Sequence, residues 1–246
     1  MKADPSRQWR LLDLQAIDTR LDQIAHARRT LPQLARLAEL EDKAQALNSL
    51  LVRAQTEFGD IQREVAKAET DVQLVRDRAA RDRARLDSGT GTAKDLQALQ
   101  HELDSLARRQ SELEDVELEV MERAESAESA ASQLAAERDA LAAQVAEATA
   151  ARDEALKDLD SEAVRVGAPR ADIVAGVGAD LVALYEKIRP QSGGLAAAPL
   201  RQRRCGGCQL ELNNVEMNRI KAAPSDEVLR CEECRRILVR TAESGL

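Results

Sequence analysis

Aromatic residues are almost missing from this sequence, which has one Trp, one Tyr and one Phe among 246 residues. So little bulky material is a poor basis for the packed core of a large α/β enzyme. Glycine (11 copies) and proline (6 copies) are also scarce, and most of them follow residue 160. The first two-thirds of the chain can therefore run as nearly uninterrupted helix, whereas the remainder must turn often.

Long apolar runs are missing as well. No stretch approaches the roughly 18 apolar residues that a membrane span requires, and no apolar segment follows Met1–Pro5. The net charge of −8 disfavours a protein that binds nucleic acid along its whole surface. Residues 199–246 nevertheless carry nine Lys or Arg against seven Asp or Glu. We expect a cytoplasmic protein that makes no membrane contact and is locally basic in this last segment.

The abundant residues are Ala, Leu, Glu, Arg and Asp, the usual composition of long helices. Apolar residues recur at spacings of three and four over residues 14–79 and again over residues 96–159. Pro32 interrupts the first pattern, and residues 88–92, which include two glycines, separate the two patterns. The fold class is therefore predicted to be mainly α, with a long antiparallel coiled-coil hairpin over residues 4–166.

The two helical patterns also fit each other. If the chain folds back at the turn, Ile61 lies opposite Val120, and Phe58 lies opposite Ala124. The one large ring then faces a run of small residues, so side-chain volumes are complementary across the seam. This agreement predicts the register of the hairpin.

The simplest interpretation of such a rod is a spacer or a dimerisation arm with solvated charged faces. The pattern leaves the choice between monomer and dimer open. His26 and His101 lie far apart along the rod and have no thiols or clustered carboxylates at metal-ligand spacing, which disfavours a site on either.

Residues 167–194 are predicted to form a linker with short helices. Gly167 and Pro169 end the second long helix, and apolar residues at helical spacing follow as far as Ile188. Tyr185 and Ile188 are expected to be core residues rather than site residues.

All four cysteines lie in the last part of the chain, in two Cys-x-x-Cys pairs. A thiolate pair with two intervening residues can hold one side of a metal ion, and two such pairs complete a tetrahedron. The predicted ligands of one metal ion are Cys205, Cys208, Cys231 and Cys234.

The spacing favours one structural zinc ion, although spacing alone leaves iron open. Two disulfides would suit a secreted chain, and the sequence carries no sign of secretion. Residues 195–246 are therefore predicted to form a zinc ribbon, with strands at 209–212 and 235–239 and a helix from Asn214 to Lys221. Four filled thiolate positions make the metal structural rather than catalytic. We expect zinc removal to unfold the ribbon alone, because ribbon and rod are expected to share few core residues.

In these features the chain resembles the bacterial zinc-ribbon proteins with a long N-terminal coiled-coil hairpin, a family once defined only as a domain of unknown function. The resemblance spans nearly the whole chain and also includes the two cysteine pairs. Its other matching segments are Leu11–Asp18, Leu31–Pro32, Asp95–Glu102, Leu184–Arg189 and Cys234–Leu238. Family members often have Gly just after the last cysteine, where this chain has Arg235. The resemblance implies a non-enzymatic protein that binds nucleic acid or other proteins.

The first functional hypothesis is a non-enzymatic adaptor or scaffold whose zinc ribbon and helical rod bind a partner protein, nucleic acid or both. Arginines next to the cysteines could bind phosphate or a partner protein, or could simply balance the thiolate charge. Base stacking is disfavoured because residues 199–246 contain no aromatic side chain. The possible contact residues are Arg201, Arg203, Arg204, Arg235 and Arg236.

The alternative is a transcription regulator that inserts the hairpin tip, flanked by Asp87 and Asp95, into RNA polymerase. Helix capping also explains Asp95, and the rod is longer than that role needs. An enzyme is disfavoured because the sequence shows no nucleophile with a nearby base, no phosphate-binding glycine loop and no open metal site.

Overall fold

The computed structural model describes residues 1–246, and the chain divides into two compact units. One unit consists of Met1–Leu34 together with Ala150–Leu246, and the other is Ala35–Thr149. The architecture is mainly α, a long helical hairpin with a small four-cysteine module, as the sequence predicts. None of the helices is both long and apolar enough to cross a membrane.

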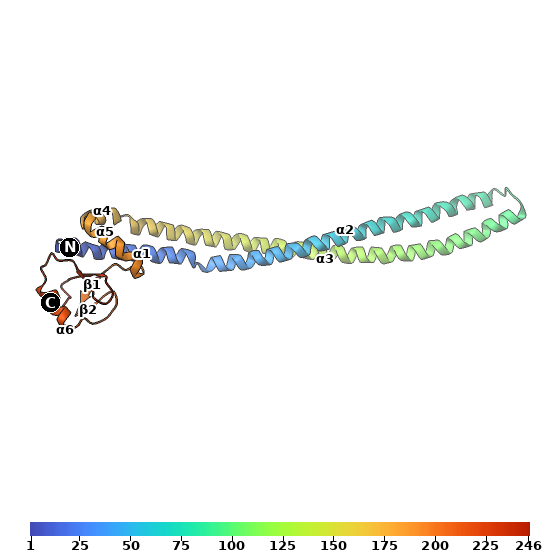
Figure 1. The fold of residues 1–246 in the computed structure, drawn as a ribbon. Helices are drawn as coiled ribbons and strands as arrows, with labels where there is room; N and C mark the ends of the chain where they lie inside the picture. Colours follow the sequence, from blue (N-terminus) through green and yellow to red (C-terminus); the bar gives the residue numbers. More distant parts are fainter. The chain divides into compact units, whose positions relative to one another are not determined.

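The hairpin unit is built from nearly all of α2 (Pro32–Asp87) and from the part of α3 (Ala93–Gly167) that precedes Ala150. These two segments lie side by side and are joined at one end by a short loop (Figure 1). Ion pairs join Arg123 of α3 to Glu64 of α2 (3.0 Å), Glu114 to Arg76 (2.6 Å) and Glu102 to Arg78 (2.6 Å). The residue number on α3 falls as that on α2 rises, so the two helices run antiparallel, as predicted.

Local signals at the tip end one helix and begin the next. Gly89 adopts a left-handed conformation with φ of 62°, where L-residues with a side chain are strained. The backbone N–H and hydroxyl of Thr92 donate hydrogen bonds of 2.9 and 2.7 Å to the Asp95 carboxylate. These two bonds, of which the one from the hydroxyl has the larger effect, hold the pKa of Asp95 below its usual value. The Asp95 carboxylate is thus engaged in capping α3.

The seam between α2 and α3 is apolar but narrow. Ile61 and Val120, the pair predicted to face each other, are both buried, and Phe58 is half-buried. A seam of two helices covers only one side of each, so much of the hairpin surface stays in solvent.

The other unit combines helix α1 (Pro5–Arg29) with the C-terminal part of the chain from Ala150 onward. Its shorter elements are α4 (Arg170–Val177), α5 (Ala179–Ile188), the 3-10 turn η1 (Arg189–Ser192), β1 (Ala197–Arg201), β2 (Arg204–Cys205), α6 (Asn214–Ala222), β3 (Leu229–Arg230) and β4 (Ile237–Val239). The strands form one sheet of order β2-β1-β4-β3, in which β1 and β4 are parallel.

The structure contradicts one local prediction for this region and contains one strand that the sequence did not predict. Residues 209–212 contribute only an isolated bridge at Glu211 instead of a strand. The unpredicted strand is β1, one of the two inner strands of the sheet, which has no β-branched residue and contains Pro199. Its neighbours, rather than its own β-propensity, hold this segment extended. The predicted helix after Asn213 and the strand ending at Val239 are confirmed.

Helix α1 shares one apolar core with the ribbon. Leu11 and Leu14 are fully buried and belong to the same cluster as Tyr185, Ala197 and Ile237. The expectation that rod and ribbon share few core residues is therefore wrong. A ribbon of this size cannot bury enough apolar surface by itself, so it packs on α1, α4 and α5.

Polar contacts fix α1 against the sheet. The buried amide of Gln15 accepts hydrogen bonds from the backbone N–H groups of Ala196 (2.6 Å) and Ala197 (3.2 Å). Its Nε2 donates to the carbonyl of Gly194 at 2.9 Å. One side chain therefore satisfies three backbone groups at the start of β1.

A buried carboxylate joins α1 to α4 and α5. Asp18 has a side chain only 3% exposed, and it accepts hydrogen bonds from Arg170 Nε (2.7 Å) and the hydroxyl of Tyr185 (2.9 Å). Burial and the nearby Asp18 charge raise the pKa of Tyr185, so this hydroxyl remains a donor at physiological pH. Tyr185 is a core residue, as predicted.

The hairpin register leads to a crosslinking prediction. Cysteines introduced at positions 61 and 120 should form a disulfide within one chain, because Ile61 and Val120 are expected to face each other. Non-reducing electrophoresis under dilute conditions measures this product. Crosslinking at positions 61 and 124 in preference to 61 and 120 would contradict the register.

The Asp18 contacts lead to a stability prediction. Asp18→Asn should lower the free energy of unfolding by about 2–4 kcal/mol, because the partly buried Arg170 loses its buried counter-charge and keeps only the exposed carboxylate of Glu186. The matched control is Asp22→Asn, whose 53% exposed carboxylate pairs with Arg189 and should contribute about 0–1 kcal/mol. Denaturant unfolding of both variants measures the difference, and equal losses would contradict a structural role for the buried carboxylate.

Candidate metal centre

The two cysteine pairs lie on matching turns. In each turn the N–H four residues after the first cysteine donates to that cysteine's carbonyl, at 2.8 Å from Gln209 to Cys205 and at 2.9 Å from Arg235 to Cys231. Gln209 and Arg235 have positive φ angles of 62° and 63°. The repeated geometry turns both thiols of each pair toward one point.

Glycines in the first turn allow the sheet to approach closely. A side chain on Gly206 would meet the carbonyl oxygen of Pro199 at 2.8 Å, and one on Gly207 would meet Cδ of the Arg236 side chain at 2.7 Å and Cβ of Ala198 in β1 at 3.2 Å. These two positions therefore need glycine so that the first cysteine pair can pack against β1.

The four thiols are brought together, as the sequence predicts. Their sulfur atoms all lie within 4.8 Å of one another, with 3.8 Å between Cys205 and Cys234 and 4.0 Å between Cys208 and Cys231. A tetrahedral zinc ion with Zn–S bonds of about 2.3 Å requires sulfurs about 3.8 Å apart. The donor set and spacing fit one structural zinc ion held by four thiolates.

The environment of the thiols differs within the site. Burial raises the pKa of Cys205 and also that of Cys231, the latter to about 12. Burial also acts to raise the pKa of Cys234, but hydrogen bonds from Arg236 and neighbouring groups bring it below the usual value. Because the thiolate is the ligand, metal binding must release protons and should weaken as the pH falls.

The thiols also belong to a second apolar core. Cys205 and Cys231 are buried with Leu200, Met217 and Leu238. Metal binding and packing of the ribbon are therefore coupled.

The five arginines predicted as contact residues differ in exposure and in their polar partners. Arg204 and Arg235 are exposed and form no ion pair, whereas Arg201 lies 3.2 Å from the Glu243 carboxylate. Arg203 is hydrogen-bonded to Asn214 and lies 3.9 Å from the Glu211 carboxylate. Arg236 is half-buried and donates hydrogen bonds to the carbonyls of Leu195 and Ser192, at 2.7 and 2.9 Å.

Non-glycine residues with positive φ angles lie on the same ribbon surface as these arginines. The four non-glycine residues with positive φ in the chain are Gln202, Arg203, Gln209 and Arg235, and all lie in the ribbon. Gln202 and Arg203 form the two-residue turn between β1 and β2, where Asn-Gly is usual. The sequence pattern alone had no signal for this strain except that Arg235 stands where glycine is common.

Comparisons with known proteins agree with this architecture. A family model described as a CT398-like coiled coil hairpin domain matches residues 14–193, and one described as a C4-type zinc ribbon domain matches residues 204–238.

Related chains match over almost their whole length. An uncharacterised protein of Mycobacterium tuberculosis is 39% identical over 240 residues, which is 98% of either chain. A solved structure from Mycobacterium smegmatis is 40% identical, with a TM-score of 0.86 over 98% of this chain and 100% of the other. The structure of CT398 from Chlamydia trachomatis has a TM-score of 0.69 at 16% identity, covers 96% and 98% of the two chains, and shows the shared fold alone.

The metal centre leads to a stoichiometry prediction. Protein purified under reducing conditions should contain one zinc ion per chain. Cys231→Ser should lose this ion, because only three of the four thiolate ligands of a structural zinc site remain. The neighbouring Glu232→Gln, which removes an exposed charge but no ligand, should keep the zinc. Elemental analysis of both variants measures this. Zinc retained by Cys231→Ser, or missing from the unaltered chain, would contradict the assignment.

Proposed function

The chain belongs to the family of CT398-like coiled-coil hairpin proteins with a C4-type zinc ribbon, and we propose that it acts as a non-enzymatic adaptor whose ribbon and helical rod bind a protein partner, nucleic acid or both. Both modules are of structural and binding types. In this proposal the zinc ion shapes the ribbon surface and takes no part in a reaction. The proposed location is the cytoplasm, where a reducing environment keeps four metal-binding thiols free of disulfides.

The observation that supports this proposal most directly is the position of arginines on strained backbone. A left-handed conformation costs a residue with a side chain about 1 kcal/mol or more relative to glycine. Arg203 and Arg235 both occupy such positions, and both side chains are exposed. Their retention is explained if the guanidinium groups contact a partner, since an Arg side chain binds phosphate or carboxylate through two parallel hydrogen bonds.

The proposed contact surface consists of Arg201, Arg203, Arg204 and Arg235. Arg236 is better explained as part of the fold, because its guanidinium group binds two backbone carbonyls. With no aromatic side chain in this segment, binding to nucleic acid would depend on phosphate contacts. Such binding would be independent of sequence and strongly weakened by salt.

The alternative, insertion of the hairpin tip into RNA polymerase, gains no specific support. Asp95 is engaged with Thr92 as a helix cap. Asp87 is exposed and forms no ion pair, as expected for a solvated residue at a helix end.

The arginine surface is tested by charge reversal in the full chain. Arg204→Glu with Arg235→Glu should weaken binding to DNA or RNA by at least about tenfold at roughly 50 mM salt, where phosphate contacts dominate. The matched control is Arg53→Glu with Arg81→Glu, two exposed hairpin arginines without ion pairs, which changes the net charge equally. Fluorescence anisotropy measures the affinities, and zinc content should be unchanged in all variants.

Two results would decide against a nucleic-acid role for the ribbon. One is an equal loss of affinity in the control variant, which would indicate a net-charge effect. The other is no binding by the unaltered chain at this salt concentration, which would leave a protein partner as the remaining form of the proposal.

A further inference from the structure

An open apolar groove with a volume of about 400 Å³ lies between α2 and α3 in the middle of the hairpin unit. Phe58 and Val65 of α2 and Ala124 of α3 line it with apolar surface. Apolar side chains that remain open to solvent in this way are candidates for contact with another molecule.

The α3 side of the groove also presents exposed apolar residues. Met121 lines the groove and is 40% exposed, and Leu118, one turn earlier on the same helix face, is 59% exposed. Both side chains therefore keep a large part of their apolar surface in solvent. Their exposure costs solubility unless another surface covers them.

On the α2 side, a glycine stands in the middle of a 56-residue helix. Gly59 shares a helix face with the groove residues Gln62 and Ala66, at spacings of three and four. A Cβ atom at Gly59 would meet nothing within 4 Å. Packing within this chain therefore does not require glycine here, and alanine would stabilise the helix. The open space beside Gly59 is suited to the close approach of a second backbone.

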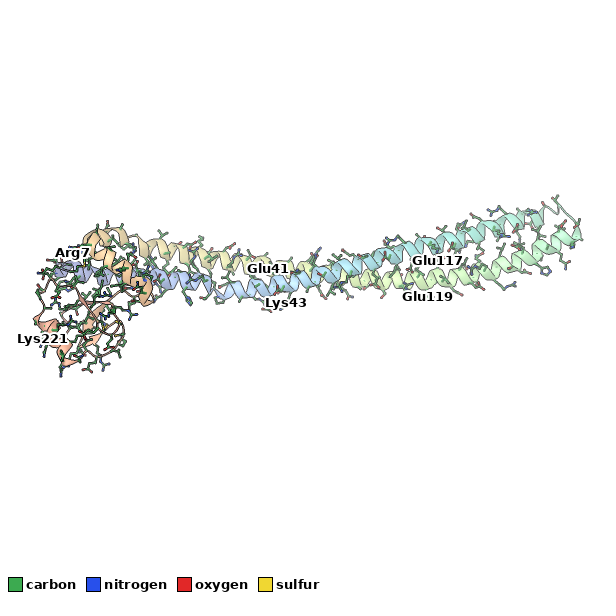
Figure 2. The ribbon with its side chains drawn as sticks, in the orientation of Figure 1. Arg7, Glu41, Lys43, Glu117, Glu119 and Lys221 are labelled. Atoms are coloured by element: carbon green, nitrogen blue, oxygen red, sulfur yellow. The ribbon has the colours of Figure 1, made fainter.

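The charge around the groove is predominantly negative. We define the acidic band as residues 57–74 of α2 with residues 112–128 of α3, which include Glu117 and Glu119 (Figure 2). The band has thirteen acidic side chains and three basic ones, whereas the remaining residues of the unit have twelve of each. The net negative charge of the hairpin unit thus lies entirely in this band.

Internal ion pairs leave most of this charge free. Of the three cations, Arg63 pairs with Asp60 and Arg123 with Glu64. Two arginines outside the band, Arg109 and Arg76, pair with Glu112 and Glu114, so nine of the thirteen acidic residues form no ion pair. The acidic residues at the groove edge, Glu69, Glu125 and Glu128, form no ion pair. Like charges this close destabilise the hairpin when it is alone.

We propose that the groove binds an amphipathic α-helix of a partner protein, with its apolar stripe on Phe58, Leu118 and Met121 and its flanking lysines or arginines toward the acidic band. This proposal rests on the adaptor function and names the chemistry of one partner. The α3 side from Leu118 to Glu128 offers about three turns of contact. Helix-in-groove binding of this kind uses apolar anchors at spacings of three and four.

The negative charge of the acidic band favours a basic helix over a second copy of this chain or a nucleic acid as the molecule bound in the groove. A second copy bound at the same face would place one acidic band against another, since symmetric dimers pair identical surfaces. Nucleic acid would be repelled by the band over its whole length. A basic amphipathic helix removes the repulsion within the band and covers the exposed apolar side chains.

The test uses a synthetic 18-residue peptide of leucine and lysine with leucines at helical spacings of three and four, labelled with fluorescein. The control peptide has the same composition in an order without an amphipathic face. Anisotropy titrations with the full zinc-loaded chain at roughly 150 mM salt should give at least about tenfold tighter binding of the amphipathic peptide, because simple charge attraction is largely screened.

Variants of the chain locate the binding. Glu125→Lys with Glu128→Lys should weaken peptide binding by at least about tenfold. Glu137→Lys with Glu147→Lys, an equal charge reversal on exposed residues of α3 outside the band, should change it by less than about threefold. Gly59→Ala should raise the thermal midpoint by about 2–4 °C yet weaken peptide binding, because the added methyl group occupies the space of the incoming backbone.

Three results would overturn the proposal: equal binding of both peptides, equal effects of the two charge reversals, or unchanged peptide binding by Gly59→Ala. A dimer of the full chain in sedimentation that Met121→Glu dissociates would also overturn it, by making a second copy the occupant. None of these measurements involves the ribbon arginines. Failure here therefore leaves the adaptor proposal standing, and loss of the arginine effect leaves this result unaffected.

Discussion

The apolar contact between α1 and strands β1 and β4 is the constraint on which the rest of its unit depends. Leu11 and Leu14 lie in one core with Ala197, Ile237 and Val239, so residues near both ends of the chain form a single folding unit. The ribbon has too little apolar surface to be stable alone, and α1 supplies what it lacks. The metal centre then fixes the far side of the same sheet, because Cys205 belongs to β2 and the second cysteine pair lies between β3 and β4. Packing on one side and metal coordination on the other hold the short strands in place.

The two units differ in net charge. The hairpin unit carries 25 acidic and 15 basic residues, whereas the remaining chain carries 19 acidic and 21 basic ones. Strained backbone occurs where arginines project from the ribbon, and an unneeded helix glycine occurs where the hairpin groove is open. Both features cost stability in the isolated chain, and both are explained if each surface contacts a different partner. An adaptor requires two such independent surfaces.

Features that depend on neighbours in sequence were predictable, and features that depend on distant residues were not. The glycine-containing turn at residues 88–92, the capping role of Asp95 and the four thiols all follow local rules, and the structure confirms them. Strand β1 was not predicted, because the amide of Gln15, about 180 residues earlier, positions its first residues. The shared core of α1 and the ribbon was missed for the same reason. Gly59 lies within an uninterrupted helical pattern, and only the space around its Cβ position distinguishes it from an ordinary helix residue.

Hydrogen exchange with and without metal tests the central claim most directly, namely that metal, ribbon and α1 form one cooperative unit. Removing zinc with a chelator should increase exchange in α1 around Leu11–Asp18 together with exchange in β4, because both lose the packing of one core. The seam of residues 35–149 should keep its protection. Exchange that increases in the ribbon while α1 stays protected would contradict the account, since it would show that the ribbon folds and unfolds independently of the helix on which it packs.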